Sequence, residues 1–238
     1  MQRFIGLLVI SLMILNAQAQ DFNALKKKIE ANLPSPSGGL SEKEVAAGLK
    51  EALTKGVETG VARLSKPDGY FKDPQIKIPM PKEAREVESK LRSLGQGKKV
   101  DEAVESMNRA AEDAANAAKD LFVTAIKNME ISDAISILKG NDDAATNYLK
   151  KSTRTSLEKK FEPNIKASLE KVDATKYWNT VFGTYNKIPF VNDVNPDLEK
   201  YVTQKAIDGL FVQVAKQELE IRKNPQARVT DLLKKVFE

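Results

Sequence analysis

The stretch that decides the fold is Val100–Lys151, VDEAVESMNRAAEDAANAAKDLFVTAIKNMEISDAISILKGNDDAATNYLKK. Apolar residues recur in it at helical spacing from Val100 to Met129, which predicts one helix of about 30 residues. Alanines fill the middle of this apolar face, so we expect neighbouring helices to approach it closely. A short helix over residues 131–138, a tight turn and a further helix follow. We expect the remaining helices to pack around the long one.

The composition indicates a helical globular domain. Of 238 residues, 41% are hydrophobic and 30% are charged, which is ordinary for a folded domain. Only 6% are aromatic and alanine is abundant, which favours closely packed helices over a sheet sandwich. The sequence therefore predicts an all-α fold: a single-domain multi-helix bundle over residues 41–238, built around one long helix.

The segments before the long helix add a second helix and an irregular strap. Residues 41–64 carry an apolar helical stripe, and the spacing of Gly56 and Gly60 would let another helix approach closely. Residues 70–81 contain three prolines, which keep them out of the middle of any sheet. We expect a short extended strap laid over the helices, with a minor hairpin as the most sheet it could form.

After the long helix, the pattern predicts further helices. Pro163 is expected to interrupt the helical region 156–182. Residues 188–191 form a second short apolar strap. Asn195-Pro196-Asp197 is typical of a helix start, with the apolar face of the following helix ending in Val214, Ala215 and Leu219.

The N-terminus has the pattern of a secretory signal peptide. Arg3 precedes an apolar run over residues 4–15, and Ala17-Gln18-Ala19 matches the small-x-small cleavage pattern. Cleavage after Ala19 would give a periplasmic or secreted protein without a transmembrane anchor, since the run is too short to span a bilayer well. Residues 20–40 then form an N-terminal segment and a flexible linker. The chain has no cysteine and hence no lipobox cysteine.

Two missing residue types restrict the chemistry. Cysteine and histidine are both absent, which excludes disulfides, ordinary zinc sites, Ser-His-Asp triads and Cys-His pairs. We expect no cofactor and no metal. Loss of Arg3 with the signal peptide lowers the formal charge from +5 to +4, and the basic runs lack interleaved aromatics, so nucleic acid is not an expected partner.

One polar cluster is predicted on the long helix. Asn108, Arg109 and Glu112 lie on the side opposite the alanine face, and Glu105 pairs with Arg109 at i,i+4 spacing. One interpretation is a solvated face with modest ion pairing. The other is a covered network in which Arg109 needs both carboxylates and the polar groups shape a site.

A second cluster is Asn141-Asp142-Asp143. Adjacent oxygen ligands can contribute to a calcium site, but the spacing does not match the EF-hand loop. The same residue types are favoured as caps of the helix that begins at Ala144. We therefore expect capping and keep divalent-cation binding as the alternative.

Six segments resemble one bacterial family, domain of unknown function 4197. They are EVAAGLKEAL (44–53), IKIPMP (76–81), SMNRAAE (106–112), LKGNDDAAT (138–146), DGLF (208–211) and TDLLK (230–234). The resemblance covers nearly the whole mature chain in order. It implies a single exported envelope domain of a mainly Gram-negative family with no established activity, and it supplies no catalytic residues. The candidate binding residues within these segments are Asn108, Arg109, Glu112, Asp142, Asp143 and Asp208.

We conclude from the sequence that the protein binds something without transforming it. The expected form is an envelope protein with a groove for a hydrophobic small molecule or a segment of another envelope protein. The alternative is a structural or interaction protein with a filled core. A carboxylate-dependent hydrolase or a Ser-Lys enzyme is less favoured, because no aromatic sugar cleft surrounds any acid pair and Lys151-Ser152 forms no recognisable motif.

Overall fold

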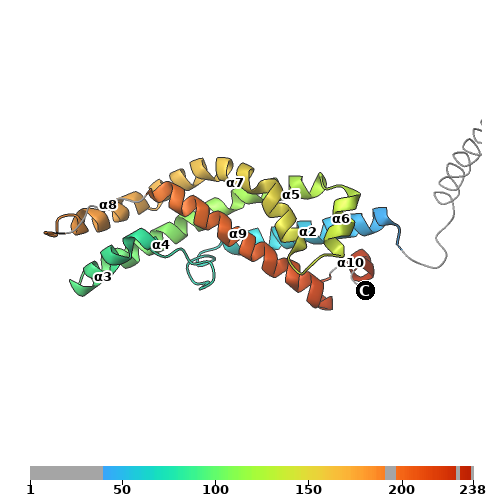
Figure 1. Ribbon diagram of the computed structural model, residues 1–238, viewed down its shortest axis with the longest axis horizontal. Coiled ribbons are helices and arrows are strands. Elements are labelled where there is room, and N and C mark those ends of the chain that lie inside the picture. The colour runs from blue at the N-terminus through green and yellow to red at the C-terminus, as the bar shows by residue number, and fades with distance from the viewer. Residues whose placement is uncertain (1–39, 191–196, 229–230, 237–238) are drawn as a thin grey trace, which may run out of the picture. The chain divides into compact units, whose positions relative to one another are not determined.

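The computed structural model describes residues 40–190, 197–228 and 231–236, and within them it confirms an all-α fold without a strand (Figure 1). The α-helices are α2 (Glu42–Leu64), α3 (Arg85–Ser93), α4 (Gly97–Ala114), α5 (Lys119–Lys127), α6 (Ile131–Leu138), α7 (Ala144–Lys171), α8 (Ala174–Tyr185), α9 (Leu198–Lys223) and α10 (Asp231–Val236). Short 3-10 helices lie at Lys82–Ala84, Ala115–Ala118 and Pro225–Ala227. The chain divides into two units, residues 1–41 and 42–238, and the following concerns the second.

The prediction of one long central helix is wrong. The helix ends at Ala114, a 3-10 segment follows over Ala115–Ala118, and α5 begins at Lys119. No glycine or proline breaks the sequence there, and alanine is the best helix former. The 3-10 segment packs against both α2 and α7, so tertiary packing rather than propensity sets the break.

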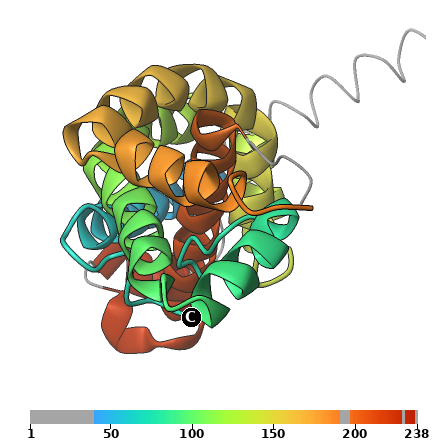
Figure 2. The same ribbon diagram turned by 90° about the vertical axis from the view of Figure 1, so that its left-hand side faces the viewer.

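Helix α9 packs against α7, α2 and α4, and in both views it lies among these three helices (Figures 1 and 2). The most connected helix is α7, which packs against α4, α5, α6, α8 and α9. The predicted interruption at Pro163 is also wrong, because α7 runs through it to Lys171. Pro163 lies on the exposed side of α7, where a carbonyl that loses its helical partner can be hydrated. The chain turns instead at Asp173, whose φ of 55° is left-handed.

The close approach predicted at Gly56 and Gly60 is confirmed. A Cβ atom on Gly56 would lie 3.3 Å from the side chain of Ile221, and one on Gly60 would lie 3.2 Å from Gln213. Both contacts are tighter than ordinary van der Waals packing. The two glycines therefore let α2 and α9 pack closely.

The core of the helical unit is a large continuous cluster of buried apolar side chains, beside which Ala52 and Ile221 form a small separate one. Its largest fully buried members come from six helices and from the segment before α3: Tyr70, Tyr185, Phe122, Phe161, Leu49, Leu64, Ile78, Leu91, Met107, Ile126, Leu149 and Leu157. Dense packing of this kind is typical of a solid core. None of the helices in the described ranges is both long and apolar enough to cross a membrane.

Residues 65–81, here called the strap, connect α2 to the 3-10 helix before α3. The apolar side chains expected to anchor it are Tyr70, Phe71, Ile76, Ile78 and Met80. All are buried except Phe71, which is half-buried. We expected an extended chain over residues 70–81, but residues 70–76 form turns, apart from Asp73, and only residues 77–81 are free of them. Asp73 explains part of this, because its carboxylate accepts a hydrogen bond from the Gln75 amide at 3.0 Å and so favours a turn.

Gly209 of α9 makes room for the buried Tyr70 ring. A Cβ atom at this position would lie 2.5 Å from Tyr70 Cε1. We expect Gly209→Ala to lower the free energy of unfolding by about 1–3 kcal/mol through overpacking, measured by urea denaturation. The matched control is Gly183→Ala in α8, where no atom lies within 4 Å of the added Cβ. That change should stabilise the protein slightly, and equal effects of the two variants would contradict the steric argument.

Candidate functional site

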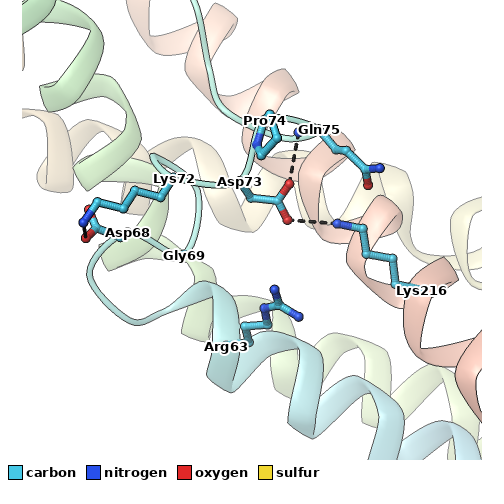
Figure 3. Close-up of a pocket in the computed structure, with 8 residues that line it drawn as sticks. All are labelled: Arg63, Asp68, Gly69, Lys72, Asp73, Pro74, Gln75 and Lys216. Carbon is cyan, nitrogen blue, oxygen red and sulfur yellow. Dashed lines mark hydrogen bonds and ion pairs between the residues drawn. The ribbon is translucent and has the colours of Figure 1, made fainter.

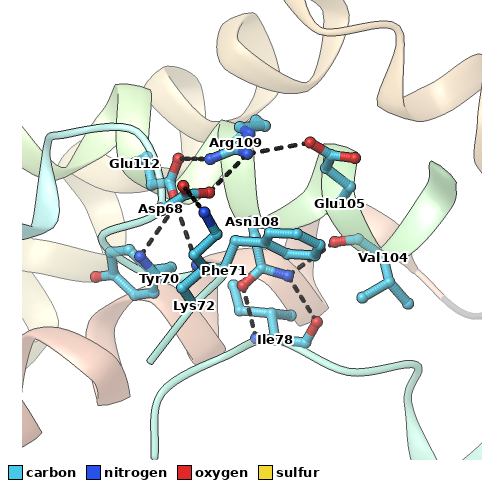
Figure 4. Close-up of polar contacts among 10 residues, drawn as sticks. All are labelled: Asp68, Tyr70, Phe71, Lys72, Ile78, Val104, Glu105, Asn108, Arg109 and Glu112. Atoms are coloured by element: carbon cyan, nitrogen blue, oxygen red, sulfur yellow. Dashed lines mark hydrogen bonds and ion pairs between the residues drawn. The ribbon is translucent and has the colours of Figure 1, made fainter. Parts of the chain in front are cut away.

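Asn108 fixes the strap to α4 (Figure 4). Its Oδ1 accepts a hydrogen bond from the Ile78 amide at 2.8 Å, and its Nδ2 donates to the Ile78 carbonyl at 2.8 Å. The same Nδ2 also donates to the Val104 carbonyl. Asn108 is fully buried, so it satisfies both backbone groups of Ile78 as a neighbouring strand would. Its amide has a structural role and is not free to bind a ligand.

Glu112 holds the other end of the strap. Its Oε1 accepts hydrogen bonds from the amides of Tyr70 at 3.0 Å and Phe71 at 3.1 Å. The carboxylate is buried, with 4% of the side chain exposed. The Tyr70 hydroxyl donates to the Ala206 carbonyl of α9 at 2.8 Å. Burial raises the pKa of Tyr70 well above its usual range, and the nearby Glu112 charge adds to this. This hydroxyl therefore stays protonated.

Arg109 is surrounded by three carboxylates. It donates to Glu112 at 2.8 Å, to Glu105 at 3.0 Å and to Asp68 of the strap at 2.8 Å. The bond to Glu112 is the largest cause of a raised pKa of Arg109. Bonds from Lys72 and then Arg109 lower the pKa of Asp68. The predicted Glu105–Arg109 pair is thus confirmed, and the covered network describes the cluster better than a fully solvated face.

The strap also borders an open hollow of about 460 Å³, here called the turn hollow (Figure 3). It is lined by Arg63, Asp68, Gly69, Lys72, Asp73, Pro74, Gln75 and Lys216. Asp73 accepts a hydrogen bond from Lys216 of α9 at 2.9 Å. Burial pushes the pKa of Asp73 upward, but the bonds from Lys216 and the Gln75 amide outweigh it and lower the pKa. The hollow is therefore lined by charged side chains from α2, the strap and α9.

Asp142 and Asp143 lie in a different place. With Gly140, Asn141, Ala215 and Leu219 they line a hollow of about 640 Å³, here called the loop hollow. Asp142 forms an ion pair with Lys223 at 2.9 Å. Asp143 stands at the N-cap of α7, but its side chain makes no capping hydrogen bond there. The predicted capping by this loop is therefore wrong at Asp143.

The cap of α7 comes instead from Glu218 of α9, which the sequence analysis missed. Glu218 accepts hydrogen bonds from the Ala145 amide at 2.9 Å and the Thr146 amide at 2.8 Å. Arg222, one turn later, donates to Glu218 at 2.8 Å and to the Ile137 carbonyl at the end of α6 at 2.8 Å. The exposed fractions are 3% for the Glu218 side chain and 10% for that of Arg222. This buried pair joins the end of α6 to the start of α7.

The sequence contains a pattern that could have identified Glu218 as a buried residue. Spacings of four and three residues place it between Val214 and Ile221, inside the apolar stripe of α9. We predicted Leu219 on that face, but Leu219 is 44% exposed. A glutamate within an apolar stripe, followed by an arginine at i+4, indicates a buried ion pair.

Asp208 lies apart from both hollows. Its carboxylate accepts a hydrogen bond from Arg154 of α7 at 2.9 Å, and this bond is the largest cause of the raised pKa of Arg154. Half of the Asp208 side chain is exposed. The structure therefore brings together Asn108, Arg109 and Glu112, places Asp142 and Asp143 in another hollow, and leaves Asp208 as a surface link between α9 and α7.

The buried carboxylates of these clusters are engaged in structural hydrogen bonds and ion pairs. The carboxylates of Glu112 and Glu218 are both bonded to an arginine and to backbone amides, which leaves neither placed as a general base. Within the described part of the chain, no group of three or more acidic side chains is arranged to hold a metal ion. Asp68 and Lys216 are further site residues that the sequence analysis did not single out, because they come together only through the strap.

These features define an all-α bundle protein with a continuous core and charged surface hollows. Residues 39–238 match the family described as "Protein of unknown function (DUF4197)", and the chain belongs to that family. Neither the curated proteins nor the solved structures contain a match to it.

Proposed function

We propose that the protein is a non-enzymatic interaction protein of the cell envelope that holds a segment of another protein in the loop hollow. One observation carries this proposal: the exposed Leu219 and the half-buried Ala215 of α9 line the same hollow of about 640 Å³ as the acidic loop between α6 and α7. A solid core with an apolar surface site fits the interaction class better than an internal ligand cavity.

The apolar part of the site is a face of α9 turned away from the core. Val212 is 37% exposed and Leu219 is 44% exposed, and seven residues separate them, so they lie on one side of the helix. Ala215 lies between them and lines the hollow with Leu219. Single exposed apolar residues are common on protein surfaces. Here they adjoin a concave site, which is where an apolar side chain of a partner could be buried.

The charged part of the site favours a basic partner. Asp142 and Asp143 lie on the rim, and Lys223 already neutralises Asp142. Asp143 then offers a carboxylate next to the apolar floor. A segment that carries an apolar side chain beside a lysine or arginine matches both features.

A hydrophobic small molecule is the weaker alternative. The two hollows described above are open and contain charged side chains, whereas most of the buried apolar side chains are packed into one large cluster. A fatty acid would need an enclosed apolar site. Saturable binding of a fluorescent fatty acid to the purified protein would favour this alternative over the partner segment.

The envelope location rests on the signal-peptide pattern of residues 1–19, which lies outside the described residues. The pattern predicts export and cleavage after Ala19. We therefore place the partner in the same compartment.

Site-specific crosslinking tests the docking site. We expect a photoreactive residue at position 219 to crosslink one discrete partner in intact cells. The matched control is position 94, because Leu94 is 53% exposed but lies outside the hollow. A synthetic peptide covering the crosslinked region of the partner should then bind the purified protein, and Leu219→Asp should weaken binding about tenfold or more, measured by fluorescence anisotropy. Equal crosslinking at both positions, or peptide binding unchanged by Leu219→Asp, would contradict the proposal.

A further inference from the structure

Among the described residues, Arg63 is the one cation of the turn hollow that takes part in no hydrogen bond or ion pair. Asp68 is bonded to Arg109 and paired with Lys72, and Asp73 is bonded to Lys216. Arg63 lines the same hollow from the last turn of α2. Among the described residues, no hydrogen bond or ion pair to its guanidinium is present. Both carboxylates of the hollow thus have a directly bonded cationic partner. The Arg63 charge also helps to lower the pKa of Asp73, but the N–H donors of this exposed guanidinium remain available to a ligand.

Arg63 is also placed so that it could bind an anion in the turn hollow. Figure 3 shows its guanidinium pointing into the hollow, toward Asp73 and the side on which Lys216 lies. A guanidinium presents a planar fork of N–H donors that matches the oxygens of a phosphate or carboxylate. The ammonium group of Lys216 has three N–H donors. One donates to Asp73, and two remain for a ligand. An anion in the hollow could therefore receive hydrogen bonds from α2 and from α9 together.

The hollow also fits the size of such a ligand. Its volume of about 460 Å³ exceeds that of a bare phosphate ion and leaves room for a small attached group. Gly69 keeps the wall near Arg63 free of a side chain, and a Cβ atom there would lie 2.5 Å from the Leu64 carbonyl oxygen. The glycine therefore lets the strap fold back against the end of α2 and form the hollow.

We infer that the turn hollow is a binding site for a phosphate-type oxyanion, with Arg63 as the principal ligand and Lys216 as the second donor. Free phosphate and the phosphate of a lipid headgroup share this chemistry. The site is separate from the loop hollow, and the inference does not depend on the partner proposed there.

Titration calorimetry with inorganic phosphate at low ionic strength tests the site, together with NMR detection of the amides of residues 63–76. We expect saturable millimolar binding with shifts confined to these residues. Arg63→Gln should reduce the affinity about tenfold, because charge-assisted bonds to the anion are lost. The matched control is Lys55→Gln, which removes the same charge from an exposed position two turns earlier in α2 and should leave the affinity nearly unchanged.

The source of the phosphate is tested in a second arm. Flotation with phosphatidylcholine vesicles, with and without phosphatidylglycerol, measures lipid binding of the unmodified protein and of Arg63→Gln. Binding that requires phosphatidylglycerol and Arg63 assigns the site to a headgroup, and phosphate binding without flotation assigns it to a soluble ligand. No phosphate binding in the millimolar range, or an equal loss in Arg63→Gln and Lys55→Gln, would overturn the inference. Either result would leave the crosslinking test at position 219 unaffected.

Discussion

Replacing Glu218 by alanine is expected to lower the free energy of unfolding by about 3–5 kcal/mol, the range for removing one partner of a buried ion pair. Four groups lose their bond to Glu218 at once: the amides of Ala145 and Thr146 at the start of α7, the Thr146 hydroxyl and the buried guanidinium of Arg222. Urea denaturation followed by circular dichroism measures the effect. Such a loss is a large fraction of the total stability of a typical domain, so partial unfolding at ambient temperature is also an expected result.

The matched control for this prediction is Glu220→Ala. Glu220 lies two residues further along α9 and is exposed, with its carboxylate bonded to the side chain of Asn224. Its loss should cost at most about 1 kcal/mol, as for exposed polar contacts. A cost at Glu218 no larger than at Glu220 would show that the interhelical cap contributes little to stability.

The second large effect is expected at Glu112. Glu112→Ala should lower the free energy of unfolding by about 2–4 kcal/mol, because the amides of Tyr70 and Phe71 and the guanidinium of Arg109 lose a buried acceptor. Native-state hydrogen exchange provides a local measurement. The amides of Tyr70 and Phe71 should exchange much faster in the variant, while amides in the middle of α7 change only with global stability.

Glu105→Ala is the control for Glu112. Glu105 bonds the same guanidinium of Arg109 at 3.0 Å, but its side chain is 49% exposed and it holds no strap amide. Its removal should cost at most about 1 kcal/mol and leave the exchange of Tyr70 unchanged. If both variants release the strap equally, the Arg109 ion pairs rather than the Glu112 amide bonds hold it in place.

The sequence was sufficient for the fold class and for local contacts. Apolar spacing identified the helices, and the i,i+4 rule identified Glu105 and Arg109, because these properties depend on neighbours along the chain. The glycine pair at Gly56 and Gly60 predicted a close helix contact, which α9 makes. What the sequence did not reveal was which distant segment covers each face. For example, Asp68 reaches Arg109 across 41 positions.

The wrong predictions also arise from contacts between distant segments. The break after Ala114 lies in a run of good helix formers, so only packing by α2 and α7 produces it. Asp143 has the residue type and position of a cap, yet Glu218 supplies the bonds from 72 and 73 positions away. Local rules state which residue types can satisfy a helix end, and tertiary structure decides which residue does.

The dependence of early segments on α9 has a consequence for the order in which the chain can fold. Tyr70 donates to the carbonyl of Ala206 and packs on Gly209, and the start of α7 is capped by Glu218. A nascent chain that ends before α9 therefore lacks the partners of its first strap and of its longest helix. Contacts that join such distant positions form late, because closing long loops is entropically costly. Folding of this unit must await synthesis of its last long helix, and C-terminal truncations before Leu198 should not yield a stable fragment.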